Sequence, residues 1–305
     1  MIRRWMSLGC VLALAGVWGC DGGGGTDSGV APGTDGGPVG TDSGMMMMAG
    51  PVGHGATRDS LTAADYSCRG TRTAPADGMD AVTFTGNVRD FFNGMPVEGL
   101  NIHFFPDNTP TAGCTGTCIS GTSSGTGEDS VMDNAGSWYA YRVVAGTGML
   151  AGAPAAYMEL VQYNEATPAA AGSRTLNAVQ VSTKNTILTI LGLTEEAGTA
   201  TITGRLFDCG DENIANATIR VFGDDGEITL PLRGRNGPRQ FYFTSGAPDI
   251  PGASETVTNV NGLYGAGNVP IPASGRVRVE LWGSLTAGGT PEMLGCERVG
   301  VIADG

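Results

Sequence analysis

The chain has 305 residues and a net charge of −13, with 17 lysine and arginine residues against 30 aspartate and glutamate residues. It contains no run of basic residues, so its composition argues against binding to nucleic acid or to an anionic membrane surface. The one lysine, Lys184, lies in Ser-Thr-Lys-Asn without the glycines of a phosphate-binding loop, which excludes that kind of nucleotide site.

The N-terminal segment predicts export and lipid attachment. Two arginines precede an apolar stretch over residues 6–18, and the tetrapeptide that ends at Cys20 resembles the cleavage and modification site of a bacterial lipoprotein. Thirteen helical residues reach about 20 Å, which is short of the roughly 30 Å hydrocarbon core, so a membrane-spanning helix is disfavoured. We predict a signal peptide over residues 1–19 and acyl chains, palmitate among them, on Cys20, with Cys10 as the weaker alternative.

Residues 20–75 are predicted to form a disordered tether. The segment 21–53 repeats Gly-Thr-Asp and has almost no aromatic or β-branched bulk with which to bury a core. A flexible chain of this length separates its ends by about 40 Å on average. The methionines at 45–48 offer thioether ligands for Cu(I), but no spaced second set accompanies them, so we interpret them as composition bias.

The seven cysteines are typical of an oxidising compartment. Cys209 and Cys296 lie near the two ends of the second predicted domain, and we therefore predict a disulfide between them. Cys68, Cys114 and Cys118 would then supply one further bridge, with its pairing left open, and one spare thiol.

A zinc site at Cys114 and Cys118 would need a second pair of ligands. The histidines of the chain are His54 and His103 alone, so the sequence predicts no metal site.

An internal repeat follows the tether. Residues 83–90 read Thr-Phe-Thr-Gly-Asn-Val-Arg-Asp and residues 201–208 read Thr-Ile-Thr-Gly-Arg-Leu-Phe-Asp. Apolar residues alternate in both segments and again in the strands that come next, where His103 aligns with Arg220. A third segment aligns 132–138 with 258–264, and in each copy a turn leads into an aromatic strand.

Short strands between turn residues predict an all-β protein with two tandem Greek-key β-sandwiches, over 76–198 and 199–305. One short helix is expected near 183–191, where apolar residues have helical spacing after Ser182 and Thr183 and before a glycine. Asp-Asp-Gly at 224–226 predicts a hairpin turn.

These residues resemble the carboxypeptidase regulatory-like family, whose pattern is Gly-x-Val-x-Asp, a turn, and later Asp-x-x-Gly-x-aromatic. The matching residues of the first copy are Gly86, Val88, Asp90, Pro96, Gly99, Leu100, Ile102, Asp133, Gly136 and Trp138. Those of the second are Gly204, Leu206, Asp208, Ile214, Ala217, Ile219, Asn259, Gly262 and Tyr264. The resemblance covers about 80–305 and implies a transthyretin-like, carbohydrate-binding-like fold. It implies no single function, because such modules occur in peptidases, adhesins, transporters and surface lipoproteins.

The sequence predicts no catalytic centre and no cofactor. Gly-x-Ser-x-Gly around Ser123 lies in a polar loop and not between a strand and a helix, as a hydrolase nucleophile would. His103, the one histidine of the folded region, is expected to point to solvent. The zinc ligands of peptidases that carry such modules, His-x-x-Glu and a second histidine, have no counterpart here. Acidic residues at 208–212 and 224–225, which could be proposed to bind calcium, are interpreted as solvated turn residues.

Trp138, Tyr139 and Tyr141 offer a candidate sugar-binding platform. Counting forward from Gly136 puts Trp138 inside the sandwich, whereas counting back from Val143 puts the two tyrosines inside. A β-bulge would reconcile the two counts and turn at least one ring outward, while packing of the rings in the core is the alternative.

The sequence therefore predicts a non-enzymatic lipoprotein of the cell envelope, attached to the outer membrane through its acyl chains. Its tandem sandwiches would act in surface binding or in structural and adhesive roles, with an envelope protein or a surface polysaccharide as partner and no nucleic acid. A carbohydrate-binding lipoprotein is the alternative.

Overall fold

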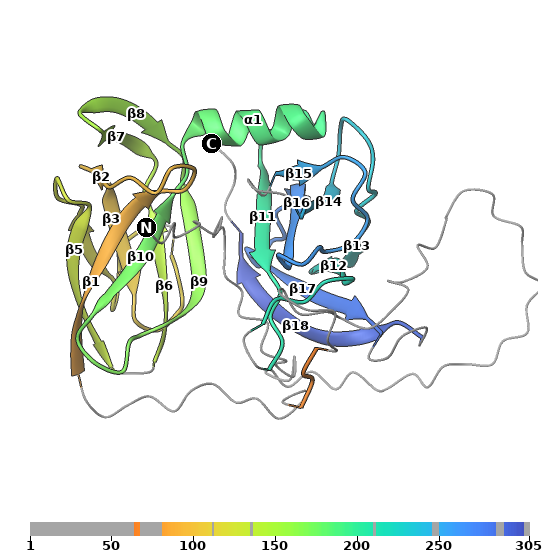
Figure 1. The fold of residues 1–305 in the computed structure, drawn as a ribbon, viewed down its shortest axis with the longest axis horizontal. Coiled ribbons are helices and arrows are strands. Elements are labelled where there is room, and N and C mark those ends of the chain that lie inside the picture. The colour runs from red at the N-terminus through yellow and green to blue at the C-terminus, as the bar shows by residue number, and fades with distance from the viewer. Residues whose placement is uncertain are drawn as a thin grey trace, which may run out of the picture.

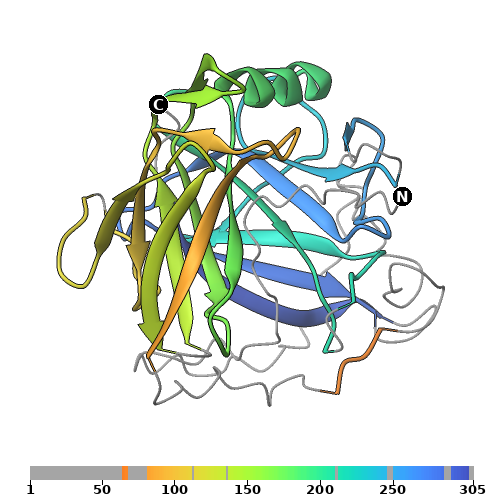
Figure 2. The same ribbon diagram turned by 60° about the vertical axis from the view of Figure 1, so that its left-hand side comes forward.

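The computed structural model describes residues 64–67, 81–111, 113–134, 137–209, 212–245, 250–284 and 290–301. The signal peptide, Cys20, most of the tether and Cys68 lie outside the described residues. The fold is mostly β, with one helix in the described part of the chain, and it divides into two side-by-side sandwiches (Figures 1 and 2). The predicted all-β class is confirmed.

The first sandwich is built from ten strands. They are β1 (Ala81–Asp90), β2 (Val97–Glu98), β3 (Asn101–Phe105), β4 (Ile119–Thr122), β5 (Glu128–Asn134), β6 (Trp138–Val143), β7 (Gly146–Leu150), β8 (Ala153–Tyr157), β9 (Leu160–Ala166) and β10 (Ser173–Ala178). Sheet β10-β1-β5 faces sheet β4-β3-β6-β9, and a small sheet β2-β7-β8 lies at one end (Figure 1). Alternate residues of the two large sheets, such as Phe84, Phe104 and Tyr139, fill the core between them.

The second sandwich has eight strands. They are β11 (Thr199–Arg205), β12 (Thr218–Gly223), β13 (Gly226–Ile228), β14 (Arg239–Phe243), β15 (Pro251–Gly252), β16 (Leu263–Pro270), β17 (Arg276–Gly283) and β18 (Glu292–Gly300). Sheet β11-β16-β14-β15 faces sheet β13-β12-β17-β18. The predicted hairpin is confirmed, because β12 and β13 pair around a two-residue turn at 224–225.

The first motif of the repeat has the same structural role in both copies. A Cβ at Gly86 would collide with Leu176, and one at Gly204 would collide with the ring of Tyr264, so both positions need glycine for close packing. The motif aspartates are buried and accept hydrogen bonds from backbone amides, as the contact from the Glu212 amide to Asp208 Oδ1 at 3.0 Å shows. These aspartates therefore hold the turns that follow the first strands.

The alignment of the third repeat segment, residues 132–138 with 258–264, is wrong. β6, which begins at Trp138, pairs with β3, whereas β16, which contains Tyr264, pairs with β11. The strand that pairs with β12 is β17, so β6 corresponds to β17 and β5 corresponds to β16. Similar turns precede two different strands, and sequence similarity alone does not distinguish them.

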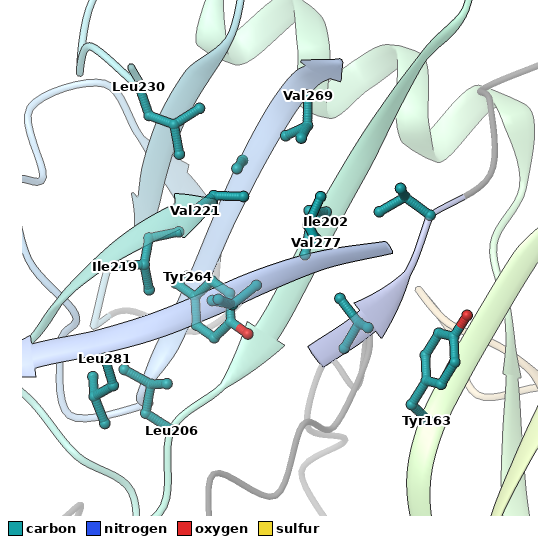
Figure 3. Packing of buried hydrophobic residues seen from close by; sticks show 14 of the residues in the cluster. Tyr163, Ile202, Leu206, Ile219, Val221, Leu230, Tyr264, Val269, Val277 and Leu281 are labelled. Atoms are coloured by element: carbon teal, nitrogen blue, oxygen red, sulfur yellow. The ribbon is translucent and has the colours of Figure 1, made fainter. Parts of the chain in front are cut away.

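The two sandwiches share a hydrophobic cluster. The outer face of sheet β4-β3-β6-β9 contributes Phe105, Ala140, Val161 and Tyr163 to the core of the second copy. Val161 and Tyr163 line one cavity together with residues of the edge strands β11 and β18, and Figure 3 shows Tyr163 beside this cluster. Burial of four apolar side chains between the copies makes them one packed unit.

Helix α1 (Val181–Leu191) crosses the top of the molecule between the two copies (Figure 1). It begins two residues before the predicted start: its N-cap is Gln180, and no side chain caps it. Its C-terminus agrees with the prediction, since Gly192 takes the left-handed conformation at φ 63°. With 11 residues α1 is too short to cross a bilayer, and the described residues include no helix that is long and apolar enough to do so.

Candidate binding face

The equivalent outer faces of the two copies differ in what they contact. Strand pairing equates β3 with β12, β6 with β17 and β9 with β18. In the first copy the apolar side chains of this face are buried against the second copy, while His103 and Arg142, which pair with each other across β3 and β6, lie on the same face. In the second copy the same face carries arginine and aromatic side chains, which we call the arginine face: Arg220, Phe222, Arg276, Arg278, Trp282 and Arg298.

The register of the strands brings these side chains together. Phe222 pairs with Arg278, and Arg278 pairs with Arg298, so the three form one row across β12, β17 and β18. Arg276 lies two residues before Arg278 in β17 and therefore points to the same side of the sheet. The fold places two arginines directly opposite each other, an arrangement that destabilises a sheet when no anion compensates it.

The guanidinium groups lie over aromatic rings. Arg220 Cζ is 4.7 Å from the centroid of the Trp282 ring, and Arg278 Cζ is 4.5 Å from that of Phe222. Distances below about 6 Å allow favourable cation–π attraction. The rings therefore help to fix the direction in which these guanidinium groups point.

Carboxylates hold two of the arginines. Arg220 donates from Nε to Glu227 Oε1 at 2.7 Å and from a second nitrogen to the other oxygen of the same carboxylate, and this pair raises the pKa of the guanidinium. Arg278 forms an ion pair with Glu280 at 2.9 Å, and Glu280 also accepts from Trp282 Nε1 at 2.8 Å. These contacts order the face before any ligand arrives.

Beside this network lies an open groove of about 470 Å³. Phe222, Asp224, Arg276, Arg278 and Arg298 are among its lining residues, so three guanidinium groups face one carboxylate. Within the described part of the chain, neither Arg276 nor Arg298 forms an ion pair, and both are exposed. The sequence contains no basic run, but the strand register gathers separated arginines into a locally positive groove. The alternation Arg-Val-Arg at 276–278 was the one local signal of it.

The predicted aromatic platform lies mainly inside the first sandwich. Tyr139 and Tyr141 are fully buried in its core, and Trp138 is half-buried on the outer face of β6. The predicted bulge exists, but the extra residue is in β9: Tyr139 pairs with Glu165 and Tyr141 with Gln162. Alternation along β6 is therefore unbroken, and the count back from Val143 was the correct one. Neither tyrosine ring can stack on a sugar without opening the core.

The cysteines follow the prediction in part. Cys114 and Cys118 form a disulfide with an S–S distance of 2.00 Å, which is one of the pairings left open. Cys209 and Cys296 are both disulfide-bonded, while their pairing with each other stays a prediction. Cys296 pairs with Glu280, on the sheet face that points away from the core, and it is buried.

His103 lies on the outer face of β3, half-buried beside this disulfide. Burial and the nearby Arg142 guanidinium lower the pKa of His103. Its Nδ1 has no hydrogen-bond partner among the described residues, and its ring nitrogens lie close to the sulfurs of Cys114 and Cys118. In a disulfide neither sulfur is a thiolate, so the three residues do not form a metal site in this state.

The other candidate residues have structural contacts. Ser123 is buried, and its hydroxyl accepts a hydrogen bond from the Leu100 amide at 3.0 Å, which ties the loop to β3. Of the proposed calcium ligands, Asp208 caps a turn and Asp224 accepts from the Ser274 amide at 2.9 Å. Hydrogen bonds from the side chain and then from the backbone amide of Ser274 lower the pKa of Asp224. Asp211 lies outside the described residues.

Comparisons with known proteins give only a likeness to solved structures. No protein-family model matches the sequence, and no curated protein matches it. The Bacillus anthracis TIE protein is 10% identical, with a TM-score of 0.22 over 74% of this chain and 32% of its own. A "putative carbohydrate binding protein" from Bacteroides uniformis ATCC 8492 is 12% identical, with a TM-score of 0.21 over 72% of this chain and 99% of its own.

A streptococcal ancillary pilin is 10% identical, with a TM-score of 0.22 over 73% of this chain and 60% of its own. This chain thus spans about a third of the TIE protein and less than two thirds of the pilin. Likenesses of this degree carry no argument about function.

Proposed function

We propose that this chain is a lipid-anchored, non-enzymatic protein of the cell envelope whose two sandwiches form a rigid surface-binding module, with the arginine face as its binding surface. The observation that carries the proposal is the contrast between two equivalent faces. Apolar side chains of one face are buried between the copies, whereas the other face is open and bears guanidinium groups already oriented by carboxylates and rings. Rigid strands that present preorganised polar groups suit recognition, because little side-chain freedom is lost on binding.

Carbohydrate binding is the second candidate, and the rings of Phe222 and Trp282 favour it. Both lie half-buried on an open sheet face and are flanked by charged groups that can hydrogen-bond to sugar hydroxyls. Aromatic side chains at such a surface combine an apolar face with a polar surrounding.

The binding proposal is tested with the full chain, purified in detergent and mixed with cell envelopes from cells that lack the protein. Cosedimentation measures binding. We expect Arg276→Glu/Arg298→Glu to weaken it at least tenfold, while Arg233→Glu/Arg235→Glu, the same charge change in an exposed loop, has no effect. Equal binding by both variants would exclude the arginine face as the binding surface.

The anchor is tested separately. Metabolic labelling with a clickable palmitate should mark the wild-type chain, and Cys20→Ser should abolish the label. Labelling of the variant at the wild-type level would refute the assignment of Cys20.

A further inference from the structure

The groove on the arginine face is lined by positively charged side chains, whereas the chain as a whole is negatively charged. The protein carries a net charge of −13, yet three guanidinium groups line this groove, against the carboxylate of Asp224 and that of Glu280, which is paired with Arg278. Asp224 is already bound to the Ser274 amide. An anion from outside the chain would therefore meet a locally favourable potential, and it would offset the repulsion between neighbouring arginines.

The cross-strand pair Arg278 and Arg298 is the centre of this site. Paired positions on adjacent antiparallel strands place their side chains about 5 Å apart at Cβ, and like charges there repel each other. Arg278 forms an ion pair with Glu280, and the Nε of Arg278 is buried without a hydrogen-bond partner among the described residues. Arg298 has no carboxylate partner within the described residues. Arg298 is therefore the member of the pair whose exposed guanidinium is open to an outside ligand.

Two carboxylates of the protein already bind guanidinium groups on this face. The Glu227 carboxylate binds Arg220 through both of its oxygens, and the Glu280 carboxylate binds Arg278. These glutamates show how an external carboxylate would dock, because a guanidinium fork matches a carboxylate in shape and in hydrogen bonds. Arg276 and Arg298 are the positions where no internal carboxylate fills that role.

The spacing of the donors favours a polymer. Arg276 and Arg278 are two residues apart in β17, which separates them by about 6.7 Å along the strand. Arg298 lies beside them on β18, and the Phe222 ring forms part of the same groove. A chain with a carboxylate on successive sugar rings can engage several guanidinium groups at once. The acidic chain as a whole repels a dense polyanion such as DNA.

We propose that this groove binds the carboxylate groups of an acidic polysaccharide. The inference rests on the proposed surface-binding function and gives it a ligand class. Binding is electrostatic in part, so it weakens as salt rises.

The experiment uses two forms of one polymer, polygalacturonate and its methyl ester, in which the carboxylates are neutralised. The full chain in detergent is titrated with each, and binding is measured by biolayer interferometry at 50 mM and 300 mM salt. We expect binding to polygalacturonate, at least tenfold weaker binding to the ester, and weakening at the higher salt. Heparin and double-stranded DNA, as sulfate and phosphate polymers, are run beside them and should bind more weakly.

Arg276→Gln/Arg298→Gln should lower the affinity for polygalacturonate at least tenfold. Arg233→Gln/Arg235→Gln is the control with the same loss of charge. Both test arginines are exposed and outside the ion-pair network, so the variant should keep the wild-type circular dichroism spectrum and melting temperature.

Equal binding to the acid and the ester would overturn the inference, as would tighter binding to DNA or heparin than to polygalacturonate. If cell envelopes bind through the arginine face but polygalacturonate does not, the inference fails and the proposed function stands. If polygalacturonate binds but envelopes do not, the proposed function fails instead.

Discussion

Two buried tyrosines on one strand should respond in opposite ways to loss of the hydroxyl group. Tyr139 and Tyr141 are both fully buried in β6, and they differ in hydrogen bonding. The Tyr141 hydroxyl donates to Gln162 and accepts from the Asn177 amide at 2.7 Å. The Tyr139 hydroxyl has no hydrogen-bond partner among the described residues, and burial raises the pKa of this group.

The magnitudes follow from these contacts. Tyr141→Phe leaves the Gln162 oxygen and the Asn177 amide without their partner, which should lower the free energy of unfolding by about 1–3 kcal/mol. Tyr139→Phe removes a buried hydroxyl that lacks a bond and keeps the ring against Phe84 and Phe104, so it should raise that free energy by about 1 kcal/mol. For a domain of this size 1 kcal/mol corresponds to about 2–4 °C in melting temperature.

The assay is urea and thermal unfolding of the full chain in detergent, followed by circular dichroism for the wild type and both variants. The reasoning predicts a melting temperature above wild type for Tyr139→Phe and below it for Tyr141→Phe. A loss of stability in Tyr139→Phe equal to that in Tyr141→Phe would show that the Tyr139 hydroxyl is hydrogen-bonded, and it would refute the reasoning.

Three further predictions concern the second copy. Burial raises the pKa of Glu297 from its ordinary value of 4.5 to about 8. Between these two pH values the folded protein holds a proton on Glu297 that the unfolded chain has released. The free energy of unfolding should therefore fall as pH rises from about 5 to 8. Glu297→Gln should reduce this fall when it is measured by urea unfolding. The same dependence on pH in the variant and the wild type would contradict its assignment to Glu297. Gly204→Ala should cost about 1–3 kcal/mol, because a Cβ meets the buried Tyr264 ring, whereas Gly172→Ala, with room for a Cβ, should change stability by less than about 0.5 kcal/mol. Peptide mapping without reductant should recover Cys209 linked to Cys296, and a peptide joining either to Cys68 would reject that pairing.

The local sequence pattern predicted where helices, turns and strands lie better than it predicted which strands pair with each other. The helix end at Gly192, the hairpin at 224–225 and the alternation of β6 depend on near neighbours in the sequence, and they were readable there. The start of the helix at Val181 was missed, because no side chain caps it.

The candidate site could not be predicted in the same way, because it depends on strand register. Arg278 and Arg298 are twenty positions apart in the sequence and become neighbours only when β17 pairs with β18. The aromatic residues at 138–141 were conspicuous in the sequence, yet two of the three rings fill the core. Composition likewise indicated an acidic chain and did not reveal the local positive groove.

The contact between the two copies also bears on self-assembly. It is heterologous: a sheet face of one copy covers the edge strands of the other, and a contact of this type can repeat without limit when every unit offers both surfaces. Strand pairing equates Ala140 with Arg278 and Tyr163 with Arg298. Because burying unpaired guanidinium groups is costly, the second copy cannot cover another molecule as the first copy covers it. The same arginines thus disfavour the addition of a further unit through this surface.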